Sequence, residues 1–500
     1  MMWNHNRPAR VGGSSDYAVR TLVLGAGAAG RTLVRDLRTV GDFGLTPIGF
    51  LDDDPRKRLI AGLPVFGDLS SLTSVIDRAR VDVVIIAMPG ISRARTLQIG
   101  DTAAAAGADV RVLPSFLAAV ERDAQVSDLL HLHLDTLLGR SERQVAYTEA
   151  RPVLMHKRVL VTGAGGSIGS ELCRQVRRLE PAALCLLDHD ESNLHQLQLD
   201  ITGEALLDTD EIVIADIRDR TRIEQVFRDF RPDVVLHAAA HKHLPLLERH
   251  PCEGVKTNVF GTQNLVEAAL KYGTERLVLI STDKAADPAS VLGATKRLAE
   301  MVVKSNAVGA TSLGSVRFGN VLGSRGSFLS VVASQIRRGQ PVTVTHPDVA
   351  RYFMTVEESV GLVLAAATMA EYGEIFVLDM GEPVRIVDLV HNYARQLGIS
   401  DYRIEFTGLR PGEKLEEALF STSDVLTPTA HQRILAVRST EVPDDFGSRL
   451  TCLLSAAEDN DAPLVRRHME DMLPEYRPTV YLPTQTPAPS PLAVPYPDGF

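Results

Sequence analysis

The stretch Lys157-Arg-Val-Leu-Val-Thr-Gly-Ala-Gly-Gly-Ser-Ile-Gly169 decides the fold of most of this chain. It reads as a short apolar strand, a glycine-rich turn and the start of a helix. Small residues at such a turn let the backbone approach a pyrophosphate, and the helix N-terminus supplies N–H groups and a positive dipole end. Ala183 to Leu187 reads as the next strand and ends at Asp188, an acid that can accept hydrogen bonds from a ribose 2′-hydroxyl. A tight structural turn is the alternative, but strand, loop, helix, strand and acid in this order favour dinucleotide binding.

The alternation of strand and helix continues downstream. Strands are expected at Glu211 to Ala215, which ends at Asp216, at Asp233 to His237 and at Arg276 to Ile280. No arginine follows Asp188 before Ser192, so nothing there would hold a 2′-phosphate, and NAD is favoured over NADP.

A second glycine loop lies nearer the start of the chain. Arg20 to Gly25 reads as an apolar strand that runs into Gly25-Ala-Gly-Ala-Ala-Gly30, and the next strand ends in Asp52 and Asp53. Two such units predict an α/β protein with two Rossmann-like, doubly wound parallel-sheet domains. A single chain seldom needs two catalytic dinucleotides. The first domain therefore either binds a nucleotide as a regulator or keeps only the scaffold.

The spacing of elements becomes looser after about residue 310. A strand at Ser312 to Phe318, a helix at Phe328 to Arg338 and the segment Phe376 to Asp379 suggest a small added lobe. The expected divisions are a flexible lead at 1–18, the first nucleotide-binding domain at 19–115, a connector at 116–156, the second domain with its substrate lobe at 157–430, a helical segment at 431–477 and a disordered proline-rich tail at 478–500.

Composition narrows the possible functions. The chain has 500 residues and a net charge of −10, which makes it a poor candidate for a nucleic-acid wrapper. Its four cysteines (Cys173, Cys185, Cys252 and Cys452) form no C-x-x-C pair, and His241, His243 and His250 lack spaced ligand partners, so no metal site is expected. No run approaches the ~18 apolar residues of a membrane helix. A reducing, cytoplasmic setting fits this pattern.

The segment Ser281-Thr-Asp-Lys-Ala285 follows the apolar strand Arg276 to Ile280. It therefore lies at the carboxyl end of a strand, where open α/β sheets bind ligands. Thr282, Asp283 and Lys284 place a hydroxyl, an acid and an amine side by side, and an adjacent acid and base can divide proton transfers between them. A solvated acid–base pair at a strand end is the alternative reading of this segment alone.

Several further segments resemble one known family when they are taken together. Residues from about 157 to 420 resemble an extended short-chain dehydrogenase/reductase, and more narrowly the bacterial nucleoside-diphosphate-sugar 4,6-dehydratases of polysaccharide biosynthesis. The matching segments are Thr162–Gly169, His237–Pro245, Lys256–Gly261, Ser281–Ala285, Val316–Gly326, Gly408–Lys414 and Leu473–Tyr476. The N-terminal half resembles the companion domain of the family's long members, which usually carry transmembrane helices that this chain lacks.

The resemblance implies a tightly bound NAD or NADP and a UDP-sugar substrate, in a homo-oligomer that packs through helices of the dehydrogenase core. Catalytic roles are expected for Thr282, Asp283, Lys284 and Lys296. Cofactor contacts are expected at Gly163, Gly165, Gly166, Ser167, Ile168, Gly169, Asp188, Asp216, Ile217, Ala238, Ala239 and Lys296. Substrate contacts are expected at Lys242, Asn320, Arg325, Arg410 and Glu413. Of these, Arg325 and Arg410 carry guanidinium groups, which suit phosphate oxygens.

One position departs from the superfamily pattern. The Tyr-x-x-x-Lys motif aligns with Leu292-Gly-Ala-Thr-Lys296, and a leucine cannot transfer a proton. Long members of the family are similar in having a residue other than tyrosine there. Deprotonation of the sugar C4 hydroxyl must then rest on Thr282 with Lys296, or on a water.

The implied reaction is the conversion of UDP-N-acetylglucosamine, or a related sugar, to its 4-keto-6-deoxy form. Lys284 would act as the base at C5, and Asp283 as the acid for the departing C6 hydroxyl. A UDP-sugar 4-epimerase and a catalytically silent nucleotide-sugar sensor or scaffold remain as alternatives.

Overall fold

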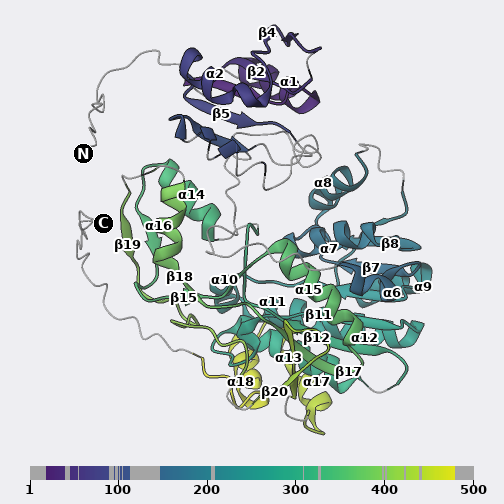
Figure 1. The fold of residues 1–500 in the computed structure, drawn as a ribbon. Helices are drawn as coiled ribbons and strands as arrows, with labels where there is room; N and C mark the ends of the chain where they lie inside the picture. The colour runs from purple at the N-terminus through teal and green to yellow at the C-terminus, as the bar shows by residue number, and fades with distance from the viewer. Residues whose placement is uncertain are drawn as a thin grey trace. The chain divides into compact units, whose positions relative to one another are not determined.

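The computed structural model describes most of the chain. The described residues are 19–39, 45–54, 56–88, 147–203, 209–307, 309–324, 328–396, 402–421, 424–438 and 442–478, with residue 399 and short pieces between 95 and 112. The chain divides into two compact units, residues 1–131 and 132–500. In Figure 1 the first unit is drawn in purple to blue and the second in blue-green to yellow.

The first unit contains a four-stranded parallel sheet in the order β2-β1-β5-β6. Its strands are β1 (Val19–Leu24), β2 (Leu45–Leu51), β5 (Val83–Ile86) and β6 (Asp109–Val112). Two apolar clusters cover its faces, with α1 (Ala28–Thr39) in one and α2 (Leu72–Ala79) in the other. A short hairpin, β3 (Leu59–Ile60) and β4 (Leu63–Pro64), follows β2. The predicted Rossmann-like fold is confirmed for this unit.

The second unit is built on a nine-stranded sheet in the order β20-β21-β17-β12-β11-β10-β7-β8-β9. Its first five strands in the sequence are β7 (Arg158–Thr162), β8 (Ala183–Asp188), β9 (Ile212–Ile214), β10 (Val234–His237) and β11 (Arg276–Ile280). All are parallel to their neighbours. The strand order reverses between β7 and β10, and such a reversal opens a crevice for ligands at the carboxyl ends of the strands.

The remaining strands of this sheet correct one prediction. The strands β12 (Ser312–Arg317) and β17 (Tyr372–Leu378) continue the parallel sheet beyond β11 instead of belonging to an added lobe. Both are buried over most of their length, as expected for inner strands of a parallel sheet. The antiparallel strands β20 (Val425–Pro428) and β21 (Ile434–Arg438) complete the edge, so the sheet extends past the expected division at residue 430.

Helices cover both faces of the large sheet. One apolar cluster includes α7 (Ser167–Arg178), α8 (Glu191–Thr202) and α15 (Val356–Met369), together with α6 (Arg151–Leu154), which follows the 3₁₀ turn at Tyr147–Ala150. The other includes α9 (Arg220–Phe230), α11 (Pro251–Gly254), the π-helix Val255–Phe260, α12 (Gly261–Tyr272), α13 (Val291–Ser305), α17 (Phe446–Glu458) and α18 (Ala462–Met472). The last two helices pack on α11.

A small lobe with its own apolar core is nevertheless present. It contains α14 (Phe328–Arg337), α16 (Ile386–Gln396) and the strand pair β14 (Val342–Val344) and β19 (Ile404–Phe406). The antiparallel pair β15 (Ala350–Arg351) and β18 (Val384–Arg385), and the parallel pair β13 (Asn320–Leu322) and β16 (Phe353–Thr355), connect it to the large sheet. Figure 1 shows α14, α16 and β19 grouped beside the main body of the second unit.

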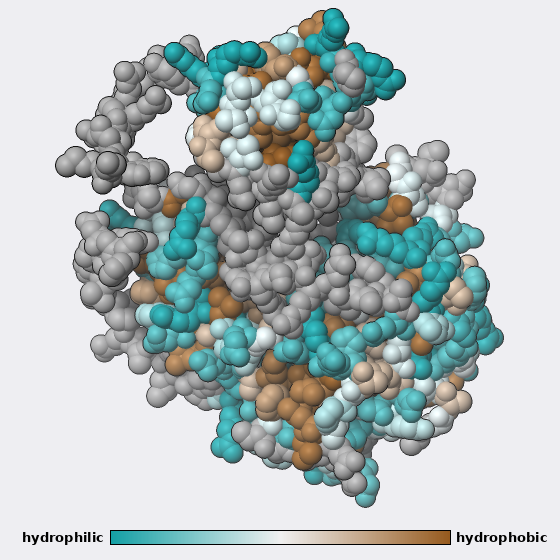
Figure 2. Space-filling model, viewed as in Figure 1, coloured by the Kyte–Doolittle hydropathy of each residue, from teal (hydrophilic) through white to brown (hydrophobic). Residues whose placement is uncertain are grey.

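Among the described residues, no helix combines the length and the apolar character needed to cross a bilayer. The face drawn in Figure 2 carries many hydrophilic residues where it is coloured, and apolar residues gather both on the first unit and over the lower part of the second. The expected lead at 1–18, most of the connector at 116–156 and the tail from residue 479 lie outside the described residues.

Candidate functional site

The glycine loop of the second unit forms a close-packed cradle between β7 and α7. Gly163 has a φ of +67°, and a Cβ atom there would lie 2.6 Å from the backbone nitrogen of Ala239. A Cβ atom on Gly169 would lie 2.0 Å from the carbonyl oxygen of Gly163. The helix begins at Ser167, after Gly166, which has no side chain to cap the first turn. A cradle of this kind, at a helix N-terminus, could hold a pyrophosphate.

Asp188 lies at the end of β8 and is tied to the same loop. Its carboxylate accepts hydrogen bonds from the backbone N–H groups of Gly165 (2.9 Å) and Asp190 (3.1 Å). His189 places Nδ1 3.1 Å from Oδ1 of the same carboxylate, on a side chain that is 71% exposed. A Cβ atom on Gly165 would meet Asn193 at 2.6 Å, so only glycine fits between the acid and α8. The acid is therefore held at the carboxyl end of β8, directly against the glycine loop.

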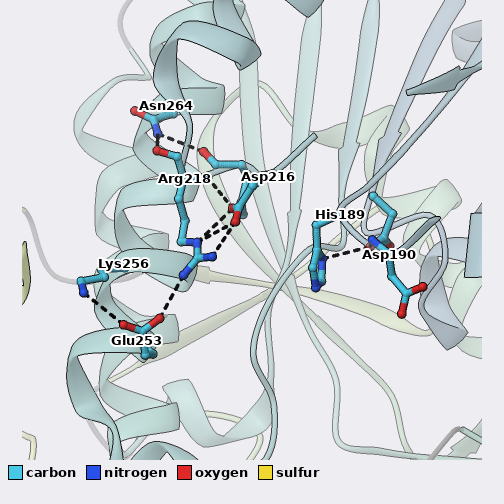
Figure 3. A network of polar contacts seen from close by, with 9 residues as sticks. His189, Asp190, Asp216, Arg218, Glu253, Lys256 and Asn264 are labelled. Carbon is cyan, nitrogen blue, oxygen red and sulfur yellow. Dashed lines mark hydrogen bonds and ion pairs between the residues drawn. The ribbon is translucent and has the colours of Figure 1, made fainter. Parts of the chain in front are cut away.

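Asp216 and Ile217 follow β9 and begin a polar network that the sequence reading did not include (Figure 3). Arg218 donates to both carboxylate oxygens of Asp216 and to Glu253, at 2.6 to 3.0 Å. Burial works to raise the pKa of Asp216, but the hydrogen bonds from Arg218 outweigh it and lower this pKa. Asn264 donates to the carbonyl oxygen of Ile217 and fixes the turn. The network thus fixes both residues, which the sequence analysis expects to contact the cofactor.

His237 holds the two strand ends at the reversal of the sheet. Its Nδ1 lies 2.8 Å from the hydroxyl of Thr162 on β7, and its Nε2 lies 3.0 Å from the hydroxyl of Thr262 on α12. Burial, assisted by nearby Lys296, lowers the pKa of His237 to about 3. The ring is therefore neutral at physiological pH, and it orders the backbone just before Ala238 and Ala239, the residues closest to Gly163.

The predicted acid and base lie together at the end of β11. Lys284 Nζ is 2.9 Å from Asp283 Oδ1, and the hydroxyl of Thr282 donates to the same oxygen at 2.8 Å. The backbone of this segment is anchored to β12, since the N–H of Asp283 donates to the carbonyl oxygen of Phe318. The Asp283 side chain is fully buried, whereas that of Lys284 is 18% exposed. The Asp–Lys pair is therefore not a solvated surface pair.

The second oxygen of Asp283 has no hydrogen-bond partner among the described residues. A buried carboxylate oxygen rarely stays unpaired in a folded protein, because losing its hydration costs free energy. This oxygen lies beside Gly319, where a Cβ atom would come within 3.0 Å of it. A ligand hydroxyl is the kind of partner that would satisfy it.

Lys296 lies on α13, one turn after Leu292. Its ammonium group donates to the carbonyl oxygen of Ile280 at 2.6 Å, directly before the acid–base segment. Burial lowers the pKa of Lys296 to about 8, although Glu300 acts in the opposite direction. Leu292 is 6% exposed and belongs to the apolar cluster around α13.

A buried ionic network supports the acid–base segment from behind. Glu300 accepts a hydrogen bond from Ser281, which precedes Thr282, and two from the fully buried Arg317, all at 2.7 Å. Arg297 joins Glu300 to Glu475, at 3.3 Å on each side, and so connects the motif Leu473–Tyr476 to the site. Three of the segments quoted from the sequence contribute to this network, namely Ser281–Ala285, Val316–Gly326 and Leu473–Tyr476, but their mutual contacts could not be predicted from the chain.

The expected substrate residues are only partly brought together. Asn320 places Oδ1 3.4 Å from Lys284 Nζ, whereas Lys242 and Arg410 are exposed. Glu413 accepts from Thr345, Arg351 and the backbone N–H of Arg410. Arg325 lies outside the described residues.

The loop that carries Arg410 and Glu413 packs against the site. The ammonium group of Lys414 donates to the carbonyl oxygen of Asp287, and a Cβ atom on Gly412 would meet Ser290 at 2.7 Å. The loop also brings in Glu417, a buried acid that the sequence reading missed, 3.8 Å from Lys284 Nζ. Its neighbour Glu416 is acidic as well, and nothing in the sequence separates the two.

Comparison with known proteins identifies the family. The model of the polysaccharide biosynthesis protein family matches residues 159–439, and that of a CoA-binding domain matches residues 5–114. The chain therefore belongs to the polysaccharide biosynthesis protein family.

Individual relatives agree with this family. A probable polysaccharide biosynthesis protein EpsC of Bacillus subtilis (strain 168) is 39% identical over 91% of this chain and 75% of its own length. A UDP-N-acetylglucosamine 4,6-dehydratase (inverting) of Campylobacter jejuni is 32% identical over 54% of this chain and 78% of its own. A UDP-glucose 4-epimerase of Rickettsia akari matches at 30% over 55% and 80%. The solved structure of Pen from Bacillus thuringiensis superposes with a TM-score of 0.52 at 31% identity, covering 57% of this chain and 89% of that one.

Proposed function

We propose that this protein is a nucleotide-sugar 4,6-dehydratase acting on UDP-N-acetylglucosamine or a closely related UDP-N-acetylhexosamine. The observation that carries the proposal is the buried Asp283–Lys284 pair, with one carboxylate oxygen left without a partner among the described residues. The relative from Campylobacter jejuni, named for this activity, supports the choice of reaction and substrate.

The cofactor is proposed to be NAD, held by the loop from Gly163 to Gly169 and by Asp188. The chemistry that a bound oxidised nicotinamide supplies is hydride acceptance from sugar C4 and hydride return to C6. Asp188 would receive the ribose hydroxyl and orient the dinucleotide, while Asp216 and Ile217 form the adenine end. Lys296, fixed by the carbonyl oxygen of Ile280, would present its cation to the nicotinamide ribose.

Lys284 and Asp283 would divide the elimination between them. A ketone at C4 acidifies the C5–H bond, so a neutral Lys284 amine can remove that proton. The resulting ammonium group returns a proton to C5 as the product forms, after any exchange with solvent. Asp283 would protonate the C6 hydroxyl, which then departs as water. Each role needs a specific protonation state, and adjacent buried groups can be tuned to hold such states.

The C4 hydroxyl also loses a proton, and Thr282 offers it a route in place of the missing tyrosine. Its hydroxyl donates to Asp283 at 2.8 Å. The C4 proton can pass to Thr282 while the proton of Thr282 passes to Asp283, which re-arms the acid for C6. One O–H bond breaks and one forms at each transfer, so the proton lost at C4 leaves with the water from C6.

A 4-epimerase is the second candidate, favoured by the similarity to the Rickettsia protein. Epimerisation needs only hydride return to C4 and gives no role to an acid–base pair around C5 and C6. A silent sensor or scaffold is the third candidate, and Leu292 is the feature that allows it. Assembly into a homo-oligomer remains a prediction.

One experiment separates the three. Purified protein is incubated with UDP-N-acetylglucosamine in D₂O and followed by proton NMR. Loss of the C6 hydroxymethyl signals, a new C6 methyl signal and deuterium at C5 are expected. A 4-epimer without a methyl signal would establish the epimerase instead. Unchanged sugar in the presence of oxidised cofactor, across a panel of nucleotide sugars, would favour the sensor.

A further inference from the structure

A second acid, Glu417, faces the proposed base Lys284. Lys284 Nζ lies 2.9 Å from Asp283 Oδ1 and 3.8 Å from Glu417 Oε1, with the side chains of the two acids 0% and 4% exposed. Asn320 adds a neutral oxygen at 3.4 Å. One ammonium group therefore lies between two buried carboxyl groups.

The backbone around Glu417 is held so that this contact persists. The carbonyl oxygen of Leu415 accepts from the N–H of Ala350 and from Arg351, both at 2.9 Å. Arg351 also pairs with Glu413, which anchors the preceding turn. The strand β15 thus clamps the segment on both sides of the turn, and the approach of Glu417 to Lys284 follows from this clamp.

The charge count makes this group a ready acceptor for one further proton, such as the one that leaves the C4 hydroxyl. If both acids were ionised beside one ammonium group, a net negative charge would stay in a poorly solvated place, which is costly. Burial and nearby Asp283 raise the pKa of Glu417, and they outweigh the opposing Lys284, Arg351 and Lys414. Burial works against the charged form of Lys284, but Asp283 and Glu417 outweigh it and raise the pKa of the amine.

The proposed reaction needs Lys284 neutral and Asp283 protonated at the same time. In the ammonium–carboxylate pair alone, Asp283 takes the C4 proton through Thr282, so Lys284 has no acceptor left for its own proton and stays an ammonium group. We propose that Glu417 is a positioning residue that holds Lys284 and takes its ammonium proton, so that Lys284 becomes a neutral base while Asp283 keeps its proton. In this transfer an N–H bond of Lys284 breaks and an O–H bond of Glu417 forms, with no change in oxidation state. This inference rests on the proposed dehydratase function.

The first test does not depend on turnover. Lysine carrying ¹³C at Cε is incorporated into the full-length protein, and the Lys284 signal, assigned with Lys284→Arg, is titrated by NMR. Glu417 is ionised where Lys284 titrates, so Glu417→Gln should lower the pKa of the amine by about one unit. Glu416, the exposed neighbour of Glu417, gives a matched control: Glu416→Gln should leave the pKa of the Lys284 amine unchanged. An unchanged Lys284 titration in Glu417→Gln would overturn the proposed coupling, whatever the reaction proves to be.

The second test uses the pH dependence of turnover. Wild-type kcat should fall toward acid pH as Glu417 becomes protonated and can no longer accept the Lys284 proton. Glu417→Gln should lower kcat about tenfold or more and remove this acid limb. Glu417→Asp keeps a carboxylate, so it should retain part of the wild-type kcat and part of the acid limb of the pH profile. Melting temperature and bound NAD measured on each variant identify a variant that has merely lost its fold. A folded, NAD-loaded Glu417→Gln with the wild-type profile would refute the proposal, whereas an inactive wild type with a shifted Lys284 titration would refute only the dehydratase assignment.

Discussion

The two glycine loops of this chain have the same internal hydrogen bonds but different surroundings. In the first unit, Asp52 accepts from the backbone N–H groups of Ala26 (2.6 Å) and Asp54 (2.9 Å). In the second, Asp188 accepts from Gly165 and Asp190 in the same way. A Cβ atom on Gly30 would lie 2.0 Å from the carbonyl oxygen of Gly25, as one on Gly169 would from Gly163.

The difference between the loops lies in what else reaches the acid. Lys57 donates to Asp52 at 2.8 Å with a side chain only 27% exposed, whereas Asp188 faces the largely exposed His189. The second loop is also one residue longer between its first and last glycine. The same turn geometry is therefore combined with different charged neighbours: Asp52 is paired with the ammonium group of Lys57, whereas Asp188 has the imidazole of His189 beside it.

The largest effect is expected from Asp283 and Lys284 of the second unit, which have no counterpart in the described part of the first unit. Asp283→Asn and Lys284→Ala should each reduce turnover by about 10² to 10⁴-fold, because each removes a proton-transfer group. Bound NAD should stay at the wild-type level, since neither residue belongs to the glycine cradle. Product formation is measured by NMR, and cofactor content by absorbance after denaturation. Full activity in the double variant would exclude these roles.

A smaller effect is expected from matched changes of the two loop acids. Asp188→Asn should weaken NAD binding by about 10 to 100-fold, because a charged acceptor is lost. Asp52→Asn should change neither NAD binding nor turnover. Calorimetric titration of cofactor-stripped protein with NAD measures binding in both variants, and product formation by NMR measures their turnover. Equal losses of NAD affinity in the two variants would show that Asp52 and Asp188 are equivalent in NAD binding, in spite of their different surroundings.

The smallest effect concerns Lys57. Burial works to raise the pKa of Asp52, but Lys57 and the hydrogen bonds from Asp54 and Ala26 outweigh it and lower this pKa. A depressed carboxyl pKa adds stability above the unfolded-state value and loses it as the pH falls through the folded-state value. Lys57→Gln should therefore lower the free energy of unfolding of the first unit by about 1 kcal/mol or less at pH 7.

Calorimetry of the full chain at pH 7 and at acid pH measures this change. Parent and variant should converge at acid pH, where Asp52 is protonated in both. The surface pair of Arg56 and Asp54 supplies the control, and Arg56→Gln should leave the transition where it is. A loss of stability in Lys57→Gln that persists at acid pH would point to packing and not to charge.

Local sequence patterns were sufficient for the loops, the first strands and the acid–base segment. Each of these depends on residues that are neighbours in the chain, such as the apolar run before Thr282. The looser spacing after residue 310 predicts a lobe for β12 and β17, because long insertions separate these strands. Sequence spacing carries little information about which strands become partners in a sheet.

The missed residues share one property. Arg218, Glu300 and Glu417 act on groups that the tertiary fold brings to them, and charged residues are common enough on any surface that their type alone signals nothing. The motif Leu473–Tyr476 is an intermediate case: the sequence identifies the segment, but not Arg297 as the residue that it contacts.

The ion pair between Glu475 and Arg297 has a consequence for how the protein is made. Residues 473–476 are translated after every residue of the proposed site, yet Arg297 is 8% exposed on its side chain and needs this late partner. Until the ribosome has passed Tyr476, the network behind Ser281 lacks one of its charges, and the faces under α17 and α18 are uncovered. Catalytic competence should therefore arise only after residue 476 has been made, so that a chain cut short before Leu473 carries the whole acid–base segment without the support of this ion pair.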